Sequence, residues 1–130
     1  MKSSSRVILT VSIIFILMLT LIRRAPVQET ISAGQNVIIS GGWQIVEMRA
    51  KGGYSPRVSS AVAGIPTILR FRTSGTFDCS LALRIPSQSI SKNLPPSGVT
   101  DIPIGIPQSG SLKGSCSMGM YPFRVDFKAP

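Results

Sequence analysis

The first apolar segment of the chain is a run without charges at residues 7–22, flanked by Lys2 and Arg6 before it and by Arg23 and Arg24 after it. An apolar run bounded by basic residues is typical of a segment that enters a membrane. As a helix the run would extend about 24 Å, somewhat less than a hydrocarbon core of about 30 Å, unless the flanking arginines reach toward the headgroups. The pattern predicts an N-terminal transmembrane helix.

A cleaved signal peptide is the alternative for this segment. Cleavage requires small residues shortly after the apolar run. Here Arg23 and Arg24 follow at once, and Ile31 stands before Ala33 where a small residue is needed. No cysteine lies near the run, which argues against a lipid-modified anchor. We therefore expect an uncleaved single-pass anchor in the cell membrane, with the rest of the chain on the extracytoplasmic side, and cleavage stays open.

Beyond residues 1–24, the sequence divides into a linker at residues 25–36 and one domain at residues 37–130. The linker has few bulky apolar residues and no clear period. In the domain, apolar and polar residues alternate with a period of two, which is typical of half-buried β-strands. Glycines and prolines separate the alternating runs, which lie at residues 44–50, 67–72, 79–85, 102–106 and 123–127.

The spacing of these runs predicts an all-β fold. About seven short strands in roughly 95 residues are typical of an antiparallel Greek-key β-sandwich or barrel. Pro103 predicts that its run is an edge strand, because proline cannot donate a hydrogen bond to a neighbouring strand. Cys79 has the same parity as Leu81 and Leu83, so we expect it to begin a strand and to point toward the core.

Composition excludes several functions. The chain has no histidine, which removes catalytic triads, imidazole acid–base catalysis and histidine-ligated zinc. Its five acidic residues are scattered singly, so paired carboxylates and carboxylate cages for hard cations are poorly supported. The formal net charge is +9, but the basic residues are dispersed and aromatic residues are few, so we expect no nucleic-acid binding. We expect a protein that is not an enzyme.

Sulfur donors gather near the C-terminus. Cys116, Met118 and Met120 are spaced at alternate positions, so in an extended chain their side chains would project from one side. The change in apolar parity before Phe123 predicts a loop around Gly119. Cys79 could lie at the same end of the sandwich. Thiolate and thioether donors without imidazole select soft metals, Cu(I) above all, so the sequence predicts a copper site.

Purely structural roles for the cysteines and methionines stay open. An exported domain with two cysteines usually pairs them, so Cys79 and Cys116 could form a disulfide. Closing the loop of about 38 residues from Cys79 to Cys116 would stabilise the fold by about 4 kcal/mol in the chain-entropy model. Methionines most often fill gaps in a core, although that role does not explain why Met118 and Met120 stand so close to a cysteine.

Three features of the sequence occur together in one known family. They are the segment GlyGlyTyrSerPro at residues 52–56, Cys79 at the start of a middle strand, and CysSerMetGlyMet at residues 116–120. Together they resemble the small cupredoxin-like domains of bacterial copper-handling and iron-uptake proteins, the EfeO-type domains. The resemblance covers about residues 44–127. It implies a Greek-key β-sandwich of cupredoxin type that holds one copper ion, with Cys79, Cys116 and Met120 as ligands and Met118 as a further donor.

The expected function is therefore capture, transfer or homeostasis of Cu(I) by a membrane-anchored, extracytoplasmic protein that exchanges copper with a donor or acceptor protein. Tyr121 and Asp78 are candidates for residues that support the ligands. Electron transfer is one alternative, which the absence of histidine opposes because blue copper sites use two imidazoles. A metal-free interaction domain with a Cys79–Cys116 disulfide is the other.

Overall fold

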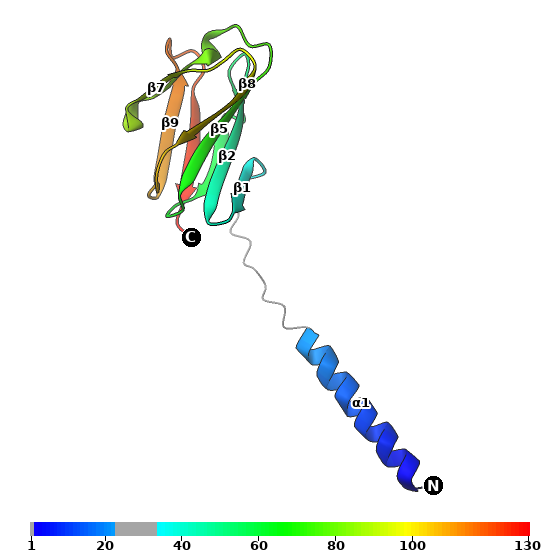
Figure 1. The fold of residues 1–130 in the computed structure, drawn as a ribbon. Helices are drawn as coiled ribbons and strands as arrows, with labels where there is room; N and C mark the ends of the chain where they lie inside the picture. The colour runs from blue at the N-terminus through cyan, green and yellow to red at the C-terminus, as the bar shows by residue number, and fades with distance from the viewer. Residues whose placement is uncertain (1, 23–33) are drawn as a thin grey trace.

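The computed structural model describes residues 2–22 and 34–130 (Figure 1). Helix α1 spans Lys2–Ile22. Its side chains are described from Val7 to Leu19, and the large apolar ones among them are exposed. Within the described residues, no helix combines the length and the hydropathy needed to cross a membrane. The predicted helix is confirmed, but the predicted transmembrane span is not supported.

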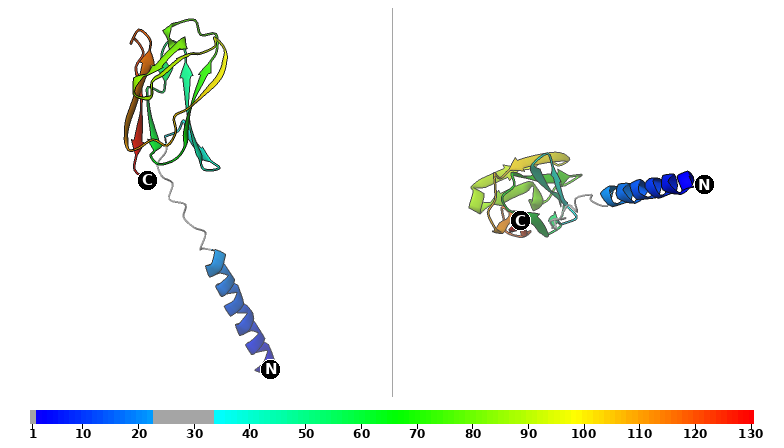
Figure 2. Two further views of the ribbon diagram at one scale, coloured as in Figure 1. Left: turned by 60° about the vertical axis from the view of Figure 1, so that its left-hand side comes forward. Right: turned by 90° about the horizontal axis from the view of Figure 1, so that it is seen from below.

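The remaining described residues form a β-sandwich of two sheets that pack face to face (Figures 1 and 2). In the first sheet β3, Tyr54–Ser55, pairs with β2, and the other strands lie in the order β1 (Val37–Ser40), β2 (Trp43–Ala50), β5 (Thr67–Thr73) and β8 (Gly98–Pro103). In the second sheet the order is β4 (Val58–Val62), β10 (Phe123–Lys128), β9 (Gly110–Cys116), β6 (Ala82–Ile85) and β7 (Ile90–Asn93).

Alternating apolar side chains from both sheets fill the space between them. At its centre, Tyr54 packs edge to face on Phe71 and Phe123, with ring centroids 5.8 and 4.9 Å away. Gln44 of β2 is fully buried between the sheets, where its side-chain amide donates hydrogen bonds of 2.9 Å to the carbonyl of Val62 and the hydroxyl of Thr67. The buried amide therefore joins the two sheets without an unsatisfied polar group.

Much of the strand pattern predicted from the sequence is confirmed. The buried and exposed positions alternate through β2, β5 and β10 as expected. β8 lies at the edge of its sheet, as Pro103 predicted. However, β8 ends at Pro103, so Ile106 is not an inward strand residue and is 64% exposed. The expected third repeat of the isoleucine run is wrong because the chain bonds to Thr67 as far as Gly105 and then turns away, since Gly105 has a φ of 74°.

The prediction that Cys79 begins a strand is also wrong. Residues Cys79–Leu81 form a short 3-10 helix, η1, and the strand starts only at Ala82. A second short 3-10 helix, η2, spans Pro86–Gln88. The side chain of Asp78 accepts a hydrogen bond of 2.8 Å from the backbone N–H of Ser80. This cap favours a helical turn over an extended chain.

The domain begins slightly before β1. The N–H of Gly34 donates to the carbonyl of Ser60 over 2.8 Å. The side chain of Asn36 donates to the carbonyl of Glu47 over 2.9 Å and to the hydroxyl of Ser59 over 2.8 Å. The last residues of the predicted linker thus belong to the sandwich, whereas residues 25–33 lie outside the described residues.

Gly114 of β9 offers a test of the packing near the end of that strand. A Cβ at this position would overlap the ring of Phe123 and come within 3.1 Å of the carbonyl oxygen of Arg84. We predict that Gly114→Ala lowers the free energy of unfolding by about 1–3 kcal/mol, the usual cost of overpacking. Urea denaturation measures this change. The neighbouring exposed position provides the control, Lys113→Ala, and equal stability of the two variants would contradict the packing.

Candidate metal centre

The structure brings the two cysteines of the chain together. Cys79 and Cys116 form a disulfide with a Cα–Cα distance of 5.6 Å and a sequence separation of 37. Cys79 begins η1, and Cys116 is the last residue of β9, where it lies opposite Leu83 of β6. The two sulfur atoms are therefore close together, as predicted. They are joined by the disulfide that the sequence analysis kept open as an alternative.

A hydrogen-bond network positions the Cys79 side of this pair. The carboxylate of Asp78 accepts from the N–H and the hydroxyl of Ser80, and from the N–H of Gly52 over 2.8 Å. The hydroxyl of Ser80 accepts from the N–H of Gly53 over 2.8 Å, and its carbonyl accepts from the hydroxyl of Tyr54 over 2.9 Å. These bonds fix η1 against the turn that joins β2 and β3.

The network also shifts the pKa values of Asp78 and Tyr54. The hydroxyl of Ser80, with the N–H of Gly52, lowers the pKa of Asp78 below its ordinary value, and Lys51 adds to the effect. Burial raises the pKa of Tyr54 far above its ordinary value, and the charge of Asp78 raises it further. Asp78 is therefore an acceptor and Tyr54 a donor at neutral pH.

A tight turn follows Cys116. The N–H of Gly119 donates to the carbonyl of Cys116 over 2.9 Å, and the N–H of Ser117 donates to the carbonyl of Ala82 over 2.8 Å. Gly119 has a φ of 73°, a conformation that favours glycine. The predicted loop is present. The extended spacing that would place three sulfur side chains on one side does not continue beyond Cys116, because β9 ends there.

The two methionines of this turn lie in solvent. Met118 is 73% exposed and Met120 is 59% exposed, so neither fills a gap in the core. Cys116, by contrast, is 1% exposed. The structure thus places two accessible thioethers within four residues of a buried sulfur atom, at the end of the sandwich where η1 lies.

Two aromatic residues at this end were not identified, or not located, from the sequence. Phe77 is 83% exposed and lies next to the capping residue Asp78. The ring of Tyr121 lies over Gly53, where an added Cβ would be 3.4 Å from its Cδ1 atom. For Phe77, the only local signal in the sequence that it lies near the candidate site is its position two residues before Cys79. The contact of Tyr121 depends on a turn more than 60 residues away.

The donors at this end fit a soft metal ion once the disulfide is reduced. In the described part of the chain, no group of three or more histidine, cysteine, aspartate or glutamate residues could hold a metal ion. Two electrons and two protons convert the disulfide into two thiols, which lose their protons when they bind a metal. The resulting thiolates would lie next to the turn that carries the exposed thioethers of Met118 and Met120, and thiolates and thioethers are donors that soft ions prefer.

Comparisons with known proteins identify the fold. No protein-family model matches the chain, and no curated protein matches its sequence. A solved structure described as a copper binding protein in the apo form is 22% identical, with a TM-score of 0.66, over 73% of this chain and 97% of that chain.

A second solved structure is the metal binding domain of the Streptococcus pneumoniae D39 Cu(I) exporting P-type ATPase CopA with Cu(I). It is 20% identical, with a TM-score of 0.63, over 71% of this chain and 92% of that chain. At these identities the likeness establishes a shared β-fold, whereas membership of the EfeO-type family is not shown. Each of these two chains consists of little more than the counterpart of the sandwich.

The disulfide should contribute strongly to stability. Reduction is expected to lower the free energy of unfolding by about 4 kcal/mol, because the crosslink restricts the unfolded chain across a loop of this length. Urea denaturation with and without dithiothreitol measures the difference. The double variant Cys79→Ser, Cys116→Ser is the control, and its stability should not respond to dithiothreitol. A wild-type protein that is equally stable in both conditions would contradict the prediction.

Proposed function

We propose that this protein, in its reduced form, binds Cu(I) through Cys79, Cys116, Met118 and Met120 and does not act as an enzyme. The observation that carries the proposal is the position of two cysteines at bonding distance beside a turn that holds two exposed thioethers. Sulfur donors of both kinds favour the cuprous ion over harder or more oxidised ions. The descriptions of the two similar structures support the proposal, since one is called a copper binding protein and the other contains Cu(I).

The disulfide makes binding depend on redox state. In the oxidised protein neither cysteine is a thiolate, so two of the four donors are absent. A dithiol reductant would form a mixed disulfide with one cysteine and release the other, and would then become a disulfide itself as the second thiol is freed. Copper binding displaces the two thiol protons. Capture and release of Cu(I) are therefore the proposed activities.

The proposed location is the extracytoplasmic side of the cell membrane. A disulfide that closes a long loop in a small domain is typical of proteins in oxidising compartments. The apolar side chains of α1, from Val7 to Leu19, are exposed and require an apolar environment. Electron transfer is less well supported, because a blue copper site uses two imidazoles and the chain has no histidine.

Competition for Cu(I) tests the proposed site. The protein is reduced, kept without oxygen and titrated against a Cu(I) complex of bathocuproine disulfonate. Wild type should withdraw copper from the chelator when reduced and lose most of this ability when oxidised. Loss of a residue that only supports a ligand typically lowers metal affinity by about tenfold or more, and loss of a ligand itself should lower it at least as much. The double variant Met118→Leu, Met120→Leu should therefore bind Cu(I) about tenfold more weakly, or weaker still.

The chain offers a matched control for the methionine variant. Met48 of β2 is 1% exposed in the core, and Met48→Leu makes the same chemical change away from the turn. Its copper affinity should equal that of wild type. If the turn variant also binds as wild type does, the methionines are not ligands. If the oxidised and reduced proteins bind equally, the cysteines are not ligands either.

A further inference from the structure

The outer face of the first sheet carries an apolar row across four strands. The Cα register aligns Ile38 of β1 with Ile45 of β2, Ile45 with Ile68 of β5, and Ile68 with Pro103 of β8. Trp43 projects from the same face of β2, two residues before Ile45, and is 49% exposed. Outward positions of a two-sheet sandwich are ordinarily polar. We call these five residues the apolar band.

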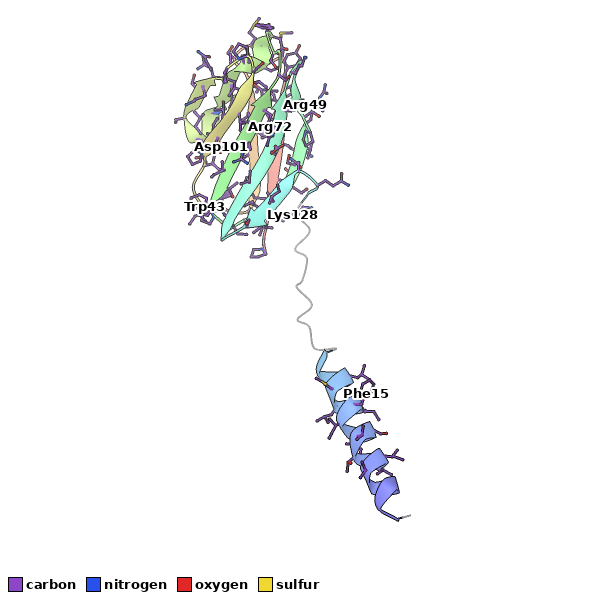
Figure 3. The ribbon with its side chains drawn as sticks, turned by 45° about the vertical axis from the view of Figure 1, so that its right-hand side comes forward. Phe15, Trp43, Arg49, Arg72, Asp101 and Lys128 are labelled. Atoms are coloured by element: carbon purple, nitrogen blue, oxygen red, sulfur yellow. A yellow bond between two sulfur atoms is a disulfide. The ribbon has the colours of Figure 1, made fainter. Side chains whose placement is uncertain are left out.

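Most of the outward residues in the next rows of that face are charged, and Val99 of β8 is an apolar exception. The next row along the strands aligns Glu47, Arg70 and Asp101. Arg70 donates to both carboxylate oxygens of Asp101, over 2.7 and 2.9 Å, and Arg72 donates to Glu47 over 2.7 Å. The outer face is therefore divided along the strand direction into an apolar half and a charged half. Figure 3 shows this order, with Trp43 at one end of the sandwich and Arg72 and Arg49 nearer the other.

The end of the sandwich beside the apolar band has no acidic side chain among its described residues. It consists of the turns at residues 40–43 and 63–66, the loop at residues 104–109 and the C-terminal residues 128–130. Its charged side chain is Lys128, which lies at the same end as Trp43 (Figure 3). Ile106 in the loop adds an apolar side chain that is 64% exposed.

The apolar band and the sulfur turn lie at opposite ends of the sandwich. β2 runs from Trp43 in the band to Ala50, and the turn after it donates hydrogen bonds to Asp78 and Ser80, beside Cys79. The chain enters the domain beside the middle of β4, where Gly34 bonds to Ser60, and β1 then runs toward the end with the band, because Ser40 pairs with Trp43. The C-terminus lies at the end with the band (Figure 1).

We propose that the apolar band is a contact surface for the headgroup region of a lipid bilayer. Tryptophan and aliphatic side chains with a nearby lysine match the interface between acyl chains and headgroups. The carboxylates of the next row, Asp101 and Glu47, are paired with Arg70 and Arg72. The apolar helix α1 precedes the domain by residues 23–33, which cannot extend beyond about 40 Å. A bilayer that holds α1 therefore keeps the band within reach, at a high effective concentration.

This inference depends on the proposed location at the membrane and is independent of copper binding. It concerns contact of the domain with a bilayer surface and does not require α1 to cross the bilayer. Its functional consequence is orientation. With the band on the lipid, Met118 and Met120 face away from the bilayer, where a copper donor or acceptor protein can reach them.

Trp43 provides a direct probe, because it is the only tryptophan of the chain. The full chain is incorporated into vesicles of phosphatidylcholine and phosphatidylglycerol, with or without bromine on the phosphatidylcholine acyl chains. We expect a blue shift of Trp43 emission relative to the fragment 34–130 in buffer, and loss of emission with brominated lipid. The fragment is a suitable reference because the core, both cysteines and all strands lie within it.

A pair of substitutions separates the apolar band from the rest of the sheet. Ile38→Ser with Ile68→Ser should reduce both the blue shift and the quenching. The matched control is Val99→Ser, which changes an outward residue of β8 that is 50% exposed and lies in the charged half. This control should behave as wild type does. Circular dichroism of each fragment verifies that the variants remain folded.

The outcomes decide the proposal. Quenching of wild type and Val99→Ser, with weaker quenching of the double variant, supports it. A blue shift without quenching by brominated lipid means that protein, such as α1 or a second copy, covers the band, and this overturns it. Emission equal to that of the fragment in buffer also overturns it. Cu(I) competition on the same samples tests copper binding separately, so failure of one proposal is distinguishable from failure of the other.

Discussion

The bond between Cys79 and Cys116 is the constraint on which the chemistry of this protein depends. It joins the short helix η1 to the last residue of β9, and the two cysteines are 37 positions apart in the sequence. While the bond is intact, it stabilises the sandwich and removes both thiolates from use. When it is reduced, the same two positions become the strongest soft donors of the chain. In the proposed function, structure and copper binding therefore use the same atoms in alternative states.

This exchange is possible because other interactions also position Cys79. The carboxylate of Asp78 and the backbone of Ser80 bond to the β2–β3 turn and to Tyr54, and none of these bonds involves sulfur. Reduction costs about 4 kcal/mol in the chain-entropy model, a large part of the stability of a small domain. We expect the polar network to hold the local geometry of η1 when the disulfide is reduced, which would keep Cys79 near Cys116.

The two ends of the sandwich differ in chemistry. One end carries the disulfide, the exposed thioethers of Met118 and Met120, and the exposed ring of Phe77. The other end adjoins the apolar band and has no acidic side chain among its described residues. A β-sandwich produces such a division readily, because its long strands, such as β2, connect the two ends and the register sets each row of outward residues. The scaffold separates the surfaces that we propose for metal and for lipid.

The sequence by itself determined the features that depend on local chemistry. Alternation with a period of two predicted the strands around residues 44–50, 67–72 and 123–127, and Pro103 predicted an edge strand, because both signals act through neighbouring backbone atoms. Only the tertiary structure decided the state of Cys79 and Cys116, the helical turn at Cys79 and the exposure of the methionines. The parallel register of β2 with β5, which assembles the apolar band, was likewise beyond the sequence. Pairing between distant segments depends on how the whole core packs, so a local sequence pattern does not predict it.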